Sequence, residues 1–233
     1  MLFVDGFAIE AVAFDMDGLM FDTERLANEL WMTAGAESGW DLSLELLTSL
    51  AGQPESSDRR ALREAHGEDF PYDALRARRI ALEAEYFRDH EVPLMPGLLE
   101  LVNFLGAEKI PMAVATSTAR YRVLPLLRKA GIIERFASIL CGDEVKNVKP
   151  DPEIYLRTAE NLGVAPGNCL VLEDSRAGIA AAYAAGAIPV MVPDLLQPDE
   201  ATFGRAARVF GSLGEVLGWL ARAAISSRKP RDS

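Results

Sequence analysis

The sequence that decides the fold is AVAFDMDGLMFDTE, residues 11–24, in which an apolar run ends in two carboxylates. Residues 9–14 predict a buried strand, because the run is short and polar residues follow it. Asp15 and Asp17 therefore stand just past a strand end, and in an open α/β sheet the carboxyl ends of the strands form the ligand crevice. Their spacing places both side chains on one side of the extended chain, where like charges need a bound cation or a shared proton.

A solvated loop or a calcium-binding loop could also carry two aspartates this close together. An EF-hand loop needs further oxygen ligands after its first aspartates. Here Leu19, Met20 and Phe21 follow, and none of them offers a side-chain oxygen. The sequence therefore favours a functional site at the end of this strand over a solvated loop or a calcium-binding loop.

The rest of the chain alternates apolar runs with amphipathic stretches. The apolar runs at 111–115, 137–140, 169–172 and 188–192 predict further buried parallel strands. The amphipathic stretches at 98–107, 120–130, 154–162 and 177–185 have helical periodicity. Strand and helix in alternation predict a doubly wound, Rossmann-like α/β fold with a parallel sheet.

One segment breaks this alternation. Residues 22–92 show helical periodicity without a convincing strand, and a linker with two prolines and a glycine, residues 91–97, follows them. We therefore expect a discontinuous core domain, residues 1–21 and 93–233, with an α-helical domain, residues 22–92, inserted after the first strand.

Polar residues also follow the later predicted strands. Thr116 and Ser117 place hydroxyls beside free backbone N–H groups at a helix start, a seat for phosphate, although such residues alone are more often plain helix caps. Glu173 and Asp174 form an acidic pair suited to a hard cation such as Mg²⁺. Lys149 precedes another helix start, where a single lysine is usually just solvated. Polar residues at several strand ends together are stronger evidence for a functional site than the residues of any one strand end alone.

Composition and charge exclude several classes of protein. The chain has 233 residues, 49% of them hydrophobic, enough for a sizeable core. Its 24 basic and 35 acidic residues give a formal charge of −11, which disfavours nucleic acid and anionic membranes as partners. Asp5 and Glu10 stand where a signal peptide would need a basic and then an apolar segment, and no apolar run is long enough to span a bilayer, so we expect a cytoplasmic protein. Cys141 and Cys169, each next to an apolar residue, predict small buried side chains without a disulfide.

In this order, the strand-end motifs resemble those of the haloacid dehalogenase superfamily. The family pattern is Asp-x-Asp after the first strand, Thr or Ser after the second, then a Lys, and an acidic pair after the fourth. The segment 15–24, together with the segments that begin at Lys149 and Glu173, is similar to the subfamily with a helical cap inserted after the first motif. Within it, the chain resembles β-phosphoglucomutase-like and pseudouridine 5'-phosphatase-like enzymes that act on sugar phosphates.

The resemblance implies a Mg²⁺-dependent phosphatase that hydrolyses a small phosphorylated metabolite. In the family the first aspartate, here Asp15, attacks phosphorus to form an aspartyl phosphate, and the second, here Asp17, is the general acid and base. The cap closes over the substrate. The other implied roles are phosphate binding by Thr116, Ser117 and Lys149, and magnesium binding by Asp15, Asp17 (through its main-chain carbonyl), Asp174 and, directly or through water, Glu173.

Other reactions of the superfamily fit less well. Dehalogenases lack the second aspartate, whereas Asp17 is present. Carbon–phosphorus hydrolases use a cap lysine, and residues 22–92 contain no lysine. A β-phosphoglucomutase-like mutase remains the alternative, although Ala27 and Glu55 occupy the positions of its cap histidine and arginine. The cap arginines that could replace that arginine are Arg59, Arg60, Arg76, Arg78 and Arg79.

Two classes outside the family fit poorly. A phospho-accepting signalling receiver is about half as long and has no helical cap, and a non-catalytic binding protein would show a damaged motif. We therefore favour hydrolysis. We expect a monomer or a small homo-oligomer.

Overall fold

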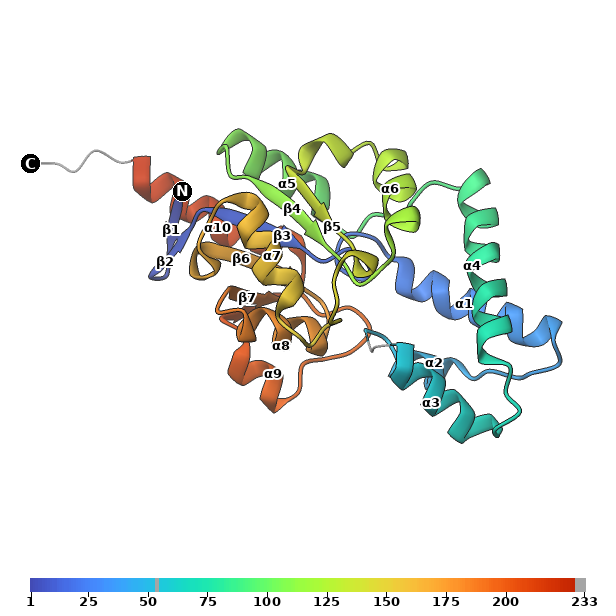
Figure 1. Ribbon diagram of the computed structural model, residues 1–233. Coiled ribbons are helices and arrows are strands. Elements are labelled where there is room, and N and C mark those ends of the chain that lie inside the picture. The colour runs from blue at the N-terminus through green and yellow to red at the C-terminus, as the bar shows by residue number, and fades with distance from the viewer. Residues whose placement is uncertain (53–54, 229–233) are drawn as a thin grey trace, which may run out of the picture.

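The structure, a computed structural model, describes residues 1–52 and 55–228, and a parallel sheet lies at its centre (Figure 1). The sheet has six strands in the order β5-β4-β3-β6-β7-β8, and every pair of neighbours is parallel. Its strands are β3 (Ala11–Phe14), β4 (Met112–Ala115), β5 (Ser138–Leu140), β6 (Cys169–Glu173), β7 (Ile188–Met191) and β8 (Arg208–Val209). The predicted α/β fold with a parallel sheet is confirmed.

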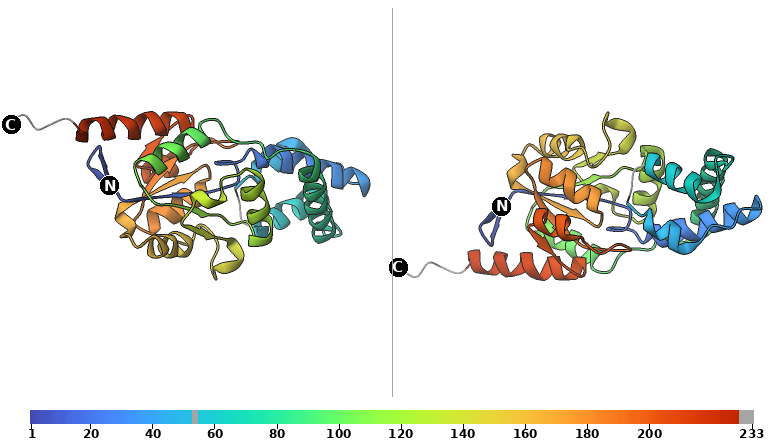
Figure 2. Two further views of the ribbon diagram at one scale, coloured as in Figure 1. Left: turned by 90° about the horizontal axis from the view of Figure 1, so that it is seen from above. Right: turned by 90° about the horizontal axis from the view of Figure 1, so that it is seen from below.

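Helices cover both faces of this sheet, as the views in Figure 2 show. The helices are α5 (Leu98–Ala107), α6 (Arg120–Lys129), α7 (Glu153–Leu162), α8 (Arg176–Ala184), α9 (Glu200–Arg205) and α10 (Leu213–Arg228), with short 3₁₀ turns at Ile133–Arg135, Gly142–Glu144 and Pro166–Asn168. Alternate residues of β3 point to opposite faces. Val12 and Phe14 belong to the core formed with α5, α6 and α10, whereas Ala11 and Ala13 belong to the core formed with α7 and α8. Burial on both faces explains why these strands are continuous apolar runs.

A small hairpin precedes the sheet and corrects one boundary. The first strand was expected over residues 9–14, but β3 begins at Ala11, and Ile9 ends β2 (Phe7–Ile9), which pairs antiparallel with β1 (Leu2–Val4). Asp5 and Gly6 form the two-residue turn, both with positive φ, as expected for an Asp-Gly hairpin turn. The hairpin packs on α10.

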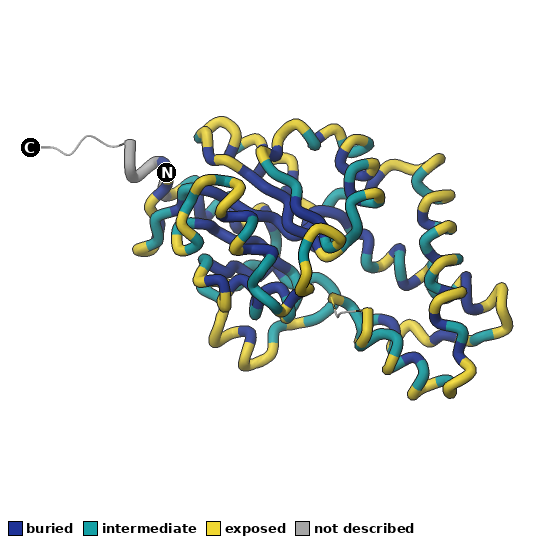
Figure 3. Tube along the Cα trace, viewed as in Figure 1, coloured by how far each residue is buried: buried dark blue, intermediate teal, exposed yellow. Residues whose placement is uncertain are grey.

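Four helices stand apart from the sheet at one end of the molecule (Figures 1 and 3). They are α1 (Thr23–Glu37), α2 (Leu44–Ser49), α3 (Glu55–His66) and α4 (Tyr72–Asp89). Apolar side chains from them and from their loops, including Leu47, Leu62 and Leu75, form a separate core. No strand occurs among the described residues of 22–92. The helical character of this insert is as expected, while the exact domain boundaries stay a prediction.

The sequence-based expectation for the two cysteines holds. Both are free and buried. Among the described residues, none of the helices combines the length and the apolar character that crossing a membrane requires.

Candidate active site

The carboxyl ends of β3, β4 and β6 open into a cavity of about 370 Å³ between the sheet and the insert. The register of the sheet brings these ends together, because β3 pairs with β4 on one side and with β6 on the other. Six of the seven predicted site residues line the cavity: Asp15, Asp17, Thr116, Ser117, Lys149 and Asp174. The seventh, Glu173, is fully buried beneath them.

Lys149 connects the nucleophile candidate to the acidic pair. Its Nζ lies 2.5 Å from Asp15 Oδ1 and 2.6 Å from Glu173 Oε1, and it donates a further hydrogen bond to the carbonyl of Ala115 at 3.0 Å. Burial lowers the pKa of Lys149, but the charges of Asp15 and Glu173 outweigh this effect and raise its pKa well above the usual value. Lys149 is therefore a charged ammonium held beside Asp15.

Glu173 is the anchor of this arrangement. Besides Lys149, it accepts hydrogen bonds from the hydroxyl of Tyr155 at 2.5 Å and from the backbone N–H and hydroxyl of Ser175 at 3.1 and 2.9 Å. Gly178 at the start of α8 leaves room for it, because a Cβ atom there would collide with the Glu173 carboxylate. Neither Tyr155 nor Ser175 was among the predicted site residues.

Asp17 is held by two hydroxyl groups from different parts of the chain. Thr23 at the start of α1 donates to its Oδ1, and Thr118 after β4 donates to its Oδ2, each at 2.7 Å. Both carboxylate oxygens are thus fixed in orientation at the edge of the cavity. Thr118 directly follows Thr116 and Ser117, the two residues that the sequence analysis marked for phosphate, but it was not predicted to contact Asp17.

The carboxyl groups at the floor of the cavity carry more negative charge than the neighbouring positive charge offsets. Oxygen atoms of Asp15, Glu173 and Asp174 lie within 4.8 Å of one another. Burial, and then the charges of neighbouring carboxylates, raise the pKa of Asp15 to about 8 against the opposing effect of Lys149. Burial followed by the charge of Asp15 raises the pKa of Asp174 well above its usual value. Gly18 approaches Asp174 so closely that a Cβ atom would collide with its carboxylate. Hard oxygen ligands that crowd together in this way fit a divalent cation such as Mg²⁺.

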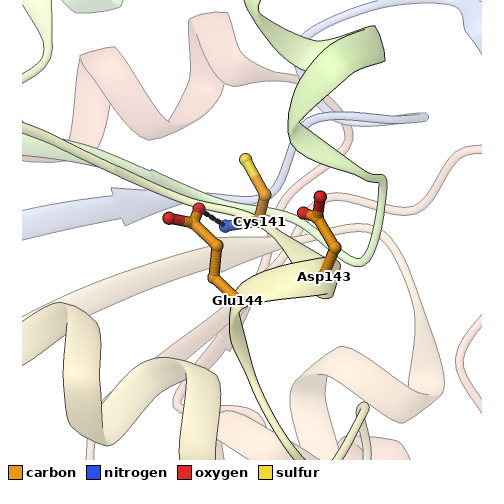
Figure 4. Close-up of side chains that lie close together, drawn as sticks. All are labelled: Cys141, Asp143 and Glu144. Atoms are coloured by element: carbon orange, nitrogen blue, oxygen red, sulfur yellow. Dashed lines mark hydrogen bonds between the residues drawn. The ribbon is translucent and has the colours of Figure 1, made fainter.

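A second group of possible metal ligands, Cys141, Asp143 and Glu144, lies after β5 (Figure 4). Its carboxylates already have partners. Asp143 accepts a hydrogen bond from the backbone N–H of Arg120, and Glu144 accepts one from the backbone N–H of Cys141 and one from the Arg120 guanidinium. Burial raises the pKa of the Cys141 thiol to about 12, so that it stays protonated. This group therefore stabilises the turn and does not fit a metal site.

The insert and helix α6 supply the opposite wall. Ala27 and Glu55, the residues placed at the mutase-type positions, both line the cavity, and so do Arg76 and Arg79. Arg76 lies 3.0 Å from Glu55, and Arg79 lies 2.8 Å from Glu83. The other arginines considered as replacements, Arg59, Arg60 and Arg78, are not among the residues that line it.

Comparison with known proteins agrees with this geometry. Residues 9–186 match the model of the haloacid dehalogenase-like hydrolase family. The phosphorylated carbohydrates phosphatase of Thermotoga maritima is 35% identical over 178 residues, 76% of this chain and 82% of that protein. The fructose-1-phosphate phosphatase YqaB of Escherichia coli is 31% identical over 74% of this chain and 90% of its own length. The crystal structure of CbbY from Rhodobacter sphaeroides in complex with phosphate superposes with a TM-score of 0.78 at 29% identity, covering 91% of this chain and 99% of that one.

Proposed function

The chain belongs to the haloacid dehalogenase-like hydrolase family, and on this premise we propose that it is a magnesium-dependent phosphatase for a small sugar phosphate or similar metabolite. It is a phosphoric monoester hydrolase, like the relatives of the same family that are named as phosphatases. The observation that carries the mechanistic proposal is the pair of aspartates at one strand end. Asp15 is held by Lys149, and Asp17 is held by two threonine hydroxyls.

In the proposed reaction Asp15 is the nucleophile. A carboxylate oxygen of Asp15 forms a bond to phosphorus while the bond from phosphorus to the ester oxygen breaks, and Asp17 gives its proton to that departing oxygen. Asp17 then takes a proton from a water molecule, which attacks phosphorus and breaks the bond to Asp15. The products are the alcohol and inorganic phosphate, and both aspartates return to their starting states.

The groups around Asp15 bind the phosphoryl oxygens. Lys149 offers a buried positive charge, Thr116 offers its hydroxyl, and Ser117 offers its hydroxyl and backbone N–H at the end of β4. The backbone N–H of Thr116 donates instead to the carbonyl of Leu140. Because phosphoryl transfer depends mainly on positioning and charge neutralisation, such donors account for much of what the protein must supply. Glu173, which accepts four hydrogen bonds, fixes the position of Lys149.

Asp15, the main-chain carbonyl of Asp17, and Asp174 are the residues that would hold Mg²⁺, with Glu173 in support. When bound, the ion supplies positive charge that offsets the negative phosphoryl oxygens and the crowded carboxylates. The insert, residues 22–92, would act as the cap that covers the leaving group and excludes bulk water. Cytoplasmic location and a monomeric or small homo-oligomeric state stay predictions.

A mutase is not favoured over a phosphatase. A mutase must bind a second phosphate at the cap, and the position of its arginine is occupied here by Glu55. Arg76 next to it is already paired with that carboxylate. Among the described residues of the cavity wall, every arginine has a carboxylate partner.

The test is phosphate release from a panel of sugar phosphates with Mg²⁺ present. Asp15→Asn should lower kcat by at least about 10³-fold with an unchanged circular-dichroism spectrum, because the amide is a poor nucleophile. Asp41→Asn, a change at an exposed aspartate of the insert, is the matched control and should remain fully active. Full activity of the Asp15→Asn variant would sink the mechanism.

The acid role of Asp17 needs its own comparison. Asp17→Asn should lower kcat for a sugar phosphate about 10²–10⁴-fold, because the alkoxide then leaves without a proton. With p-nitrophenyl phosphate, whose leaving group needs little proton help, the loss should be much smaller. Equal losses on both esters would argue against proton donation by Asp17.

A further inference from the structure

The wall of the cavity that faces the leaving group is lined by charges of both signs. It is built from α1, α3 and α4 of the insert and from α6 of the core. Its carboxyl groups belong to Glu24, Glu55, Asp58 and Glu83, and its guanidinium groups belong to Arg76, Arg79 and Arg122. Four carboxyls face three guanidiniums, so this wall carries no excess of positive charge.

The guanidinium groups are already engaged. Arg76 pairs with Glu55 at 3.0 Å, while Arg79 and Arg122 share Glu83 at 2.8 and 2.7 Å. Arg79 and Arg122 together carry one positive charge more than Glu83 neutralises. Both of them lie within the electrostatic reach of Asp17 on the phosphoryl side of the cavity.

Two carboxyl groups of the wall have no such partner. Neither the Glu24 carboxyl nor the Asp58 carboxyl has a hydrogen bond or an ion pair within the described part of the chain, and Asp58 Oδ1 is a buried acceptor without a donor. Burial first, and then the charge of Asp17 for Glu24 and of Glu55 for Asp58, raise the pKa of both groups to about 7. Above pH 7, where both groups are ionised, a second anionic group on a substrate would therefore meet carboxylates that no hydrogen bond or ion pair neutralises.

A hydroxyl group fits the same place much better. Arg79, whose side chain is only 9% exposed, has a buried Nε–H without an acceptor, in the same wall as the unpaired Asp58. A hydroxyl can accept one hydrogen bond and donate another. A molecule with several hydroxyls can therefore satisfy both the unpaired Nε–H of Arg79 and the unpaired carboxyl oxygen of Asp58. Buried polar groups that find such partners recover the cost of their desolvation.

We propose that this wall selects phosphomonoesters with a neutral, polyhydroxylated leaving group. Asp58 accepts a hydrogen bond from one hydroxyl of that leaving group. A second phosphate or a carboxylate on the leaving group is rejected. The inference rests on the proposed phosphatase function, since it concerns the leaving group of that reaction. It assigns Asp58 the role of a specificity-determining residue.

The test compares matched esters with the full chain and Mg²⁺ at pH 8.5, above the pKa of about 7, so that Asp58 is ionised. The first pair is glycerol 3-phosphate and 3-phosphoglycerate, which differ only in that a carboxylate replaces a hydroxymethyl group. The second pair is fructose 1-phosphate and fructose 1,6-bisphosphate. In each pair kcat/KM should be roughly tenfold higher for the ester with the neutral leaving group. Equal values, or a preference for the anionic members, would overturn the inference.

Asp58→Asn then tests the residue itself. The amide removes the negative charge at nearly the same size, so the ratio of kcat/KM between neutral and anionic members should fall several-fold. Glu64→Gln on the same helix, where the side chain is 72% exposed, removes one charge outside the cavity and should keep the parent ratio. An Asp58→Asn ratio equal to that of Glu64→Gln would refute the role of Asp58.

The chemistry is monitored separately with p-nitrophenyl phosphate. Magnesium-dependent release of nitrophenol together with a preference for anionic esters would overturn this inference and leave the phosphatase function standing. If no ester, including p-nitrophenyl phosphate, released phosphate, the proposed function would fall and this inference with it.

Discussion

Glu83 ties the insert to the core through a nearly buried cluster of charges. Its carboxylate accepts hydrogen bonds from Arg79 on the same helix at 2.8 Å and from Arg122 on α6, which lies 2.7 Å from both of its oxygens. The side chains of Glu83, Arg79 and Arg122 are 9, 9 and 18% exposed. Glu83→Gln keeps the shape of the side chain and removes the charge that both guanidiniums share.

The expected loss of stability follows from this burial. Removing one partner of a buried ion pair costs about 3–5 kcal/mol, because the remaining charge is left without compensation. Arg122 is the most exposed of the three and can turn toward water, so we expect the low end, about 3 kcal/mol. For a chain of this size, 1 kcal/mol shifts Tm by about 2–4 °C, so Tm should fall by about 6–12 °C.

Thermal unfolding of Glu83→Gln beside a matched variant measures this effect. Glu85→Gln on the same helix removes a charge whose side chain is 49% exposed and whose pair with Arg78 is 3.3 Å long. Such surface pairs contribute little, so its Tm should stay within about 2 °C of the parent. Equal Tm values for the two variants would mean that the Glu83 cluster does not hold the insert against the core.

Three further predictions concern the floor and the wall of the cavity. Tyr155→Phe removes one of the four hydrogen bonds to Glu173 and should lower the free energy of unfolding, measured by urea titration, by about 1.5–3 kcal/mol; an unchanged midpoint would contradict this. EDTA should abolish phosphate release, and excess Mg²⁺ should restore it and raise Tm, because ligand binding to the folded state stabilises it; activity that persists in EDTA would refute the metal proposal. The folded state holds the proton of Asp58 up to about pH 7, whereas the unfolded chain releases it near 3.8, so stability is lost between these values. The Tm of Asp58→Asn relative to the parent should therefore rise from pH 5 to pH 7 and level off by pH 8, and a constant difference would argue against the shift.

The positions of the predicted site residues followed from a simple rule of parallel sheets. Apart from Lys149, which was placed before a helix start, each residue was placed directly after an apolar run, and strands that run in one direction end at one edge. The structure accordingly brings Asp15, Thr116 and Asp174 to the same cavity, although about 100 residues separate the first two and about 160 separate the first from the last. Their catalytic roles stay predictions until the variants are measured.

The hairpin at the N-terminus shows a signal that was present and not used. Residues 2–4 and 7–9 flank Asp5-Gly6, a dipeptide typical of tight hairpin turns, and the two flanks form β1 and β2. The run from Ile9 to Phe14 looked continuous because apolar character alone does not mark where one strand ends and the next begins. Glu10, the single charged residue of that run, stands at the break.

Tyr155, Glu83 and Arg122 could not be identified in the same way. Tyr155 lies on α7 and reaches Glu173 on β6, and Glu83 on α4 reaches Arg122 on α6, 39 positions along the chain. Helical periodicity tells which side of a helix is apolar. It does not tell how that helix is rotated and shifted against the strand or helix that it packs on, which depends on the packing of many side chains at once.

Residues at the strand ends and residues of the insert should respond differently to substitution. The residues that bind the phosphoryl group beside Asp15 stand on short loops whose positions are fixed by the register of the sheet, so they act on every ester in the same way. Asp58 and Arg79 stand on helices of the insert. The described polar contacts between the insert and the core include the ion pair of Glu83 with Arg122. Substitutions of the strand-end residues that bind the phosphoryl group should therefore change kcat on all esters together, whereas substitutions in the insert wall should change the ratio of kcat/KM between esters. Asp17 is the exception at the strand ends, because the effect of its loss depends on how much proton help the leaving group needs. An insert substitution that lowers kcat equally for every leaving group would show that the wall takes part in the chemistry itself.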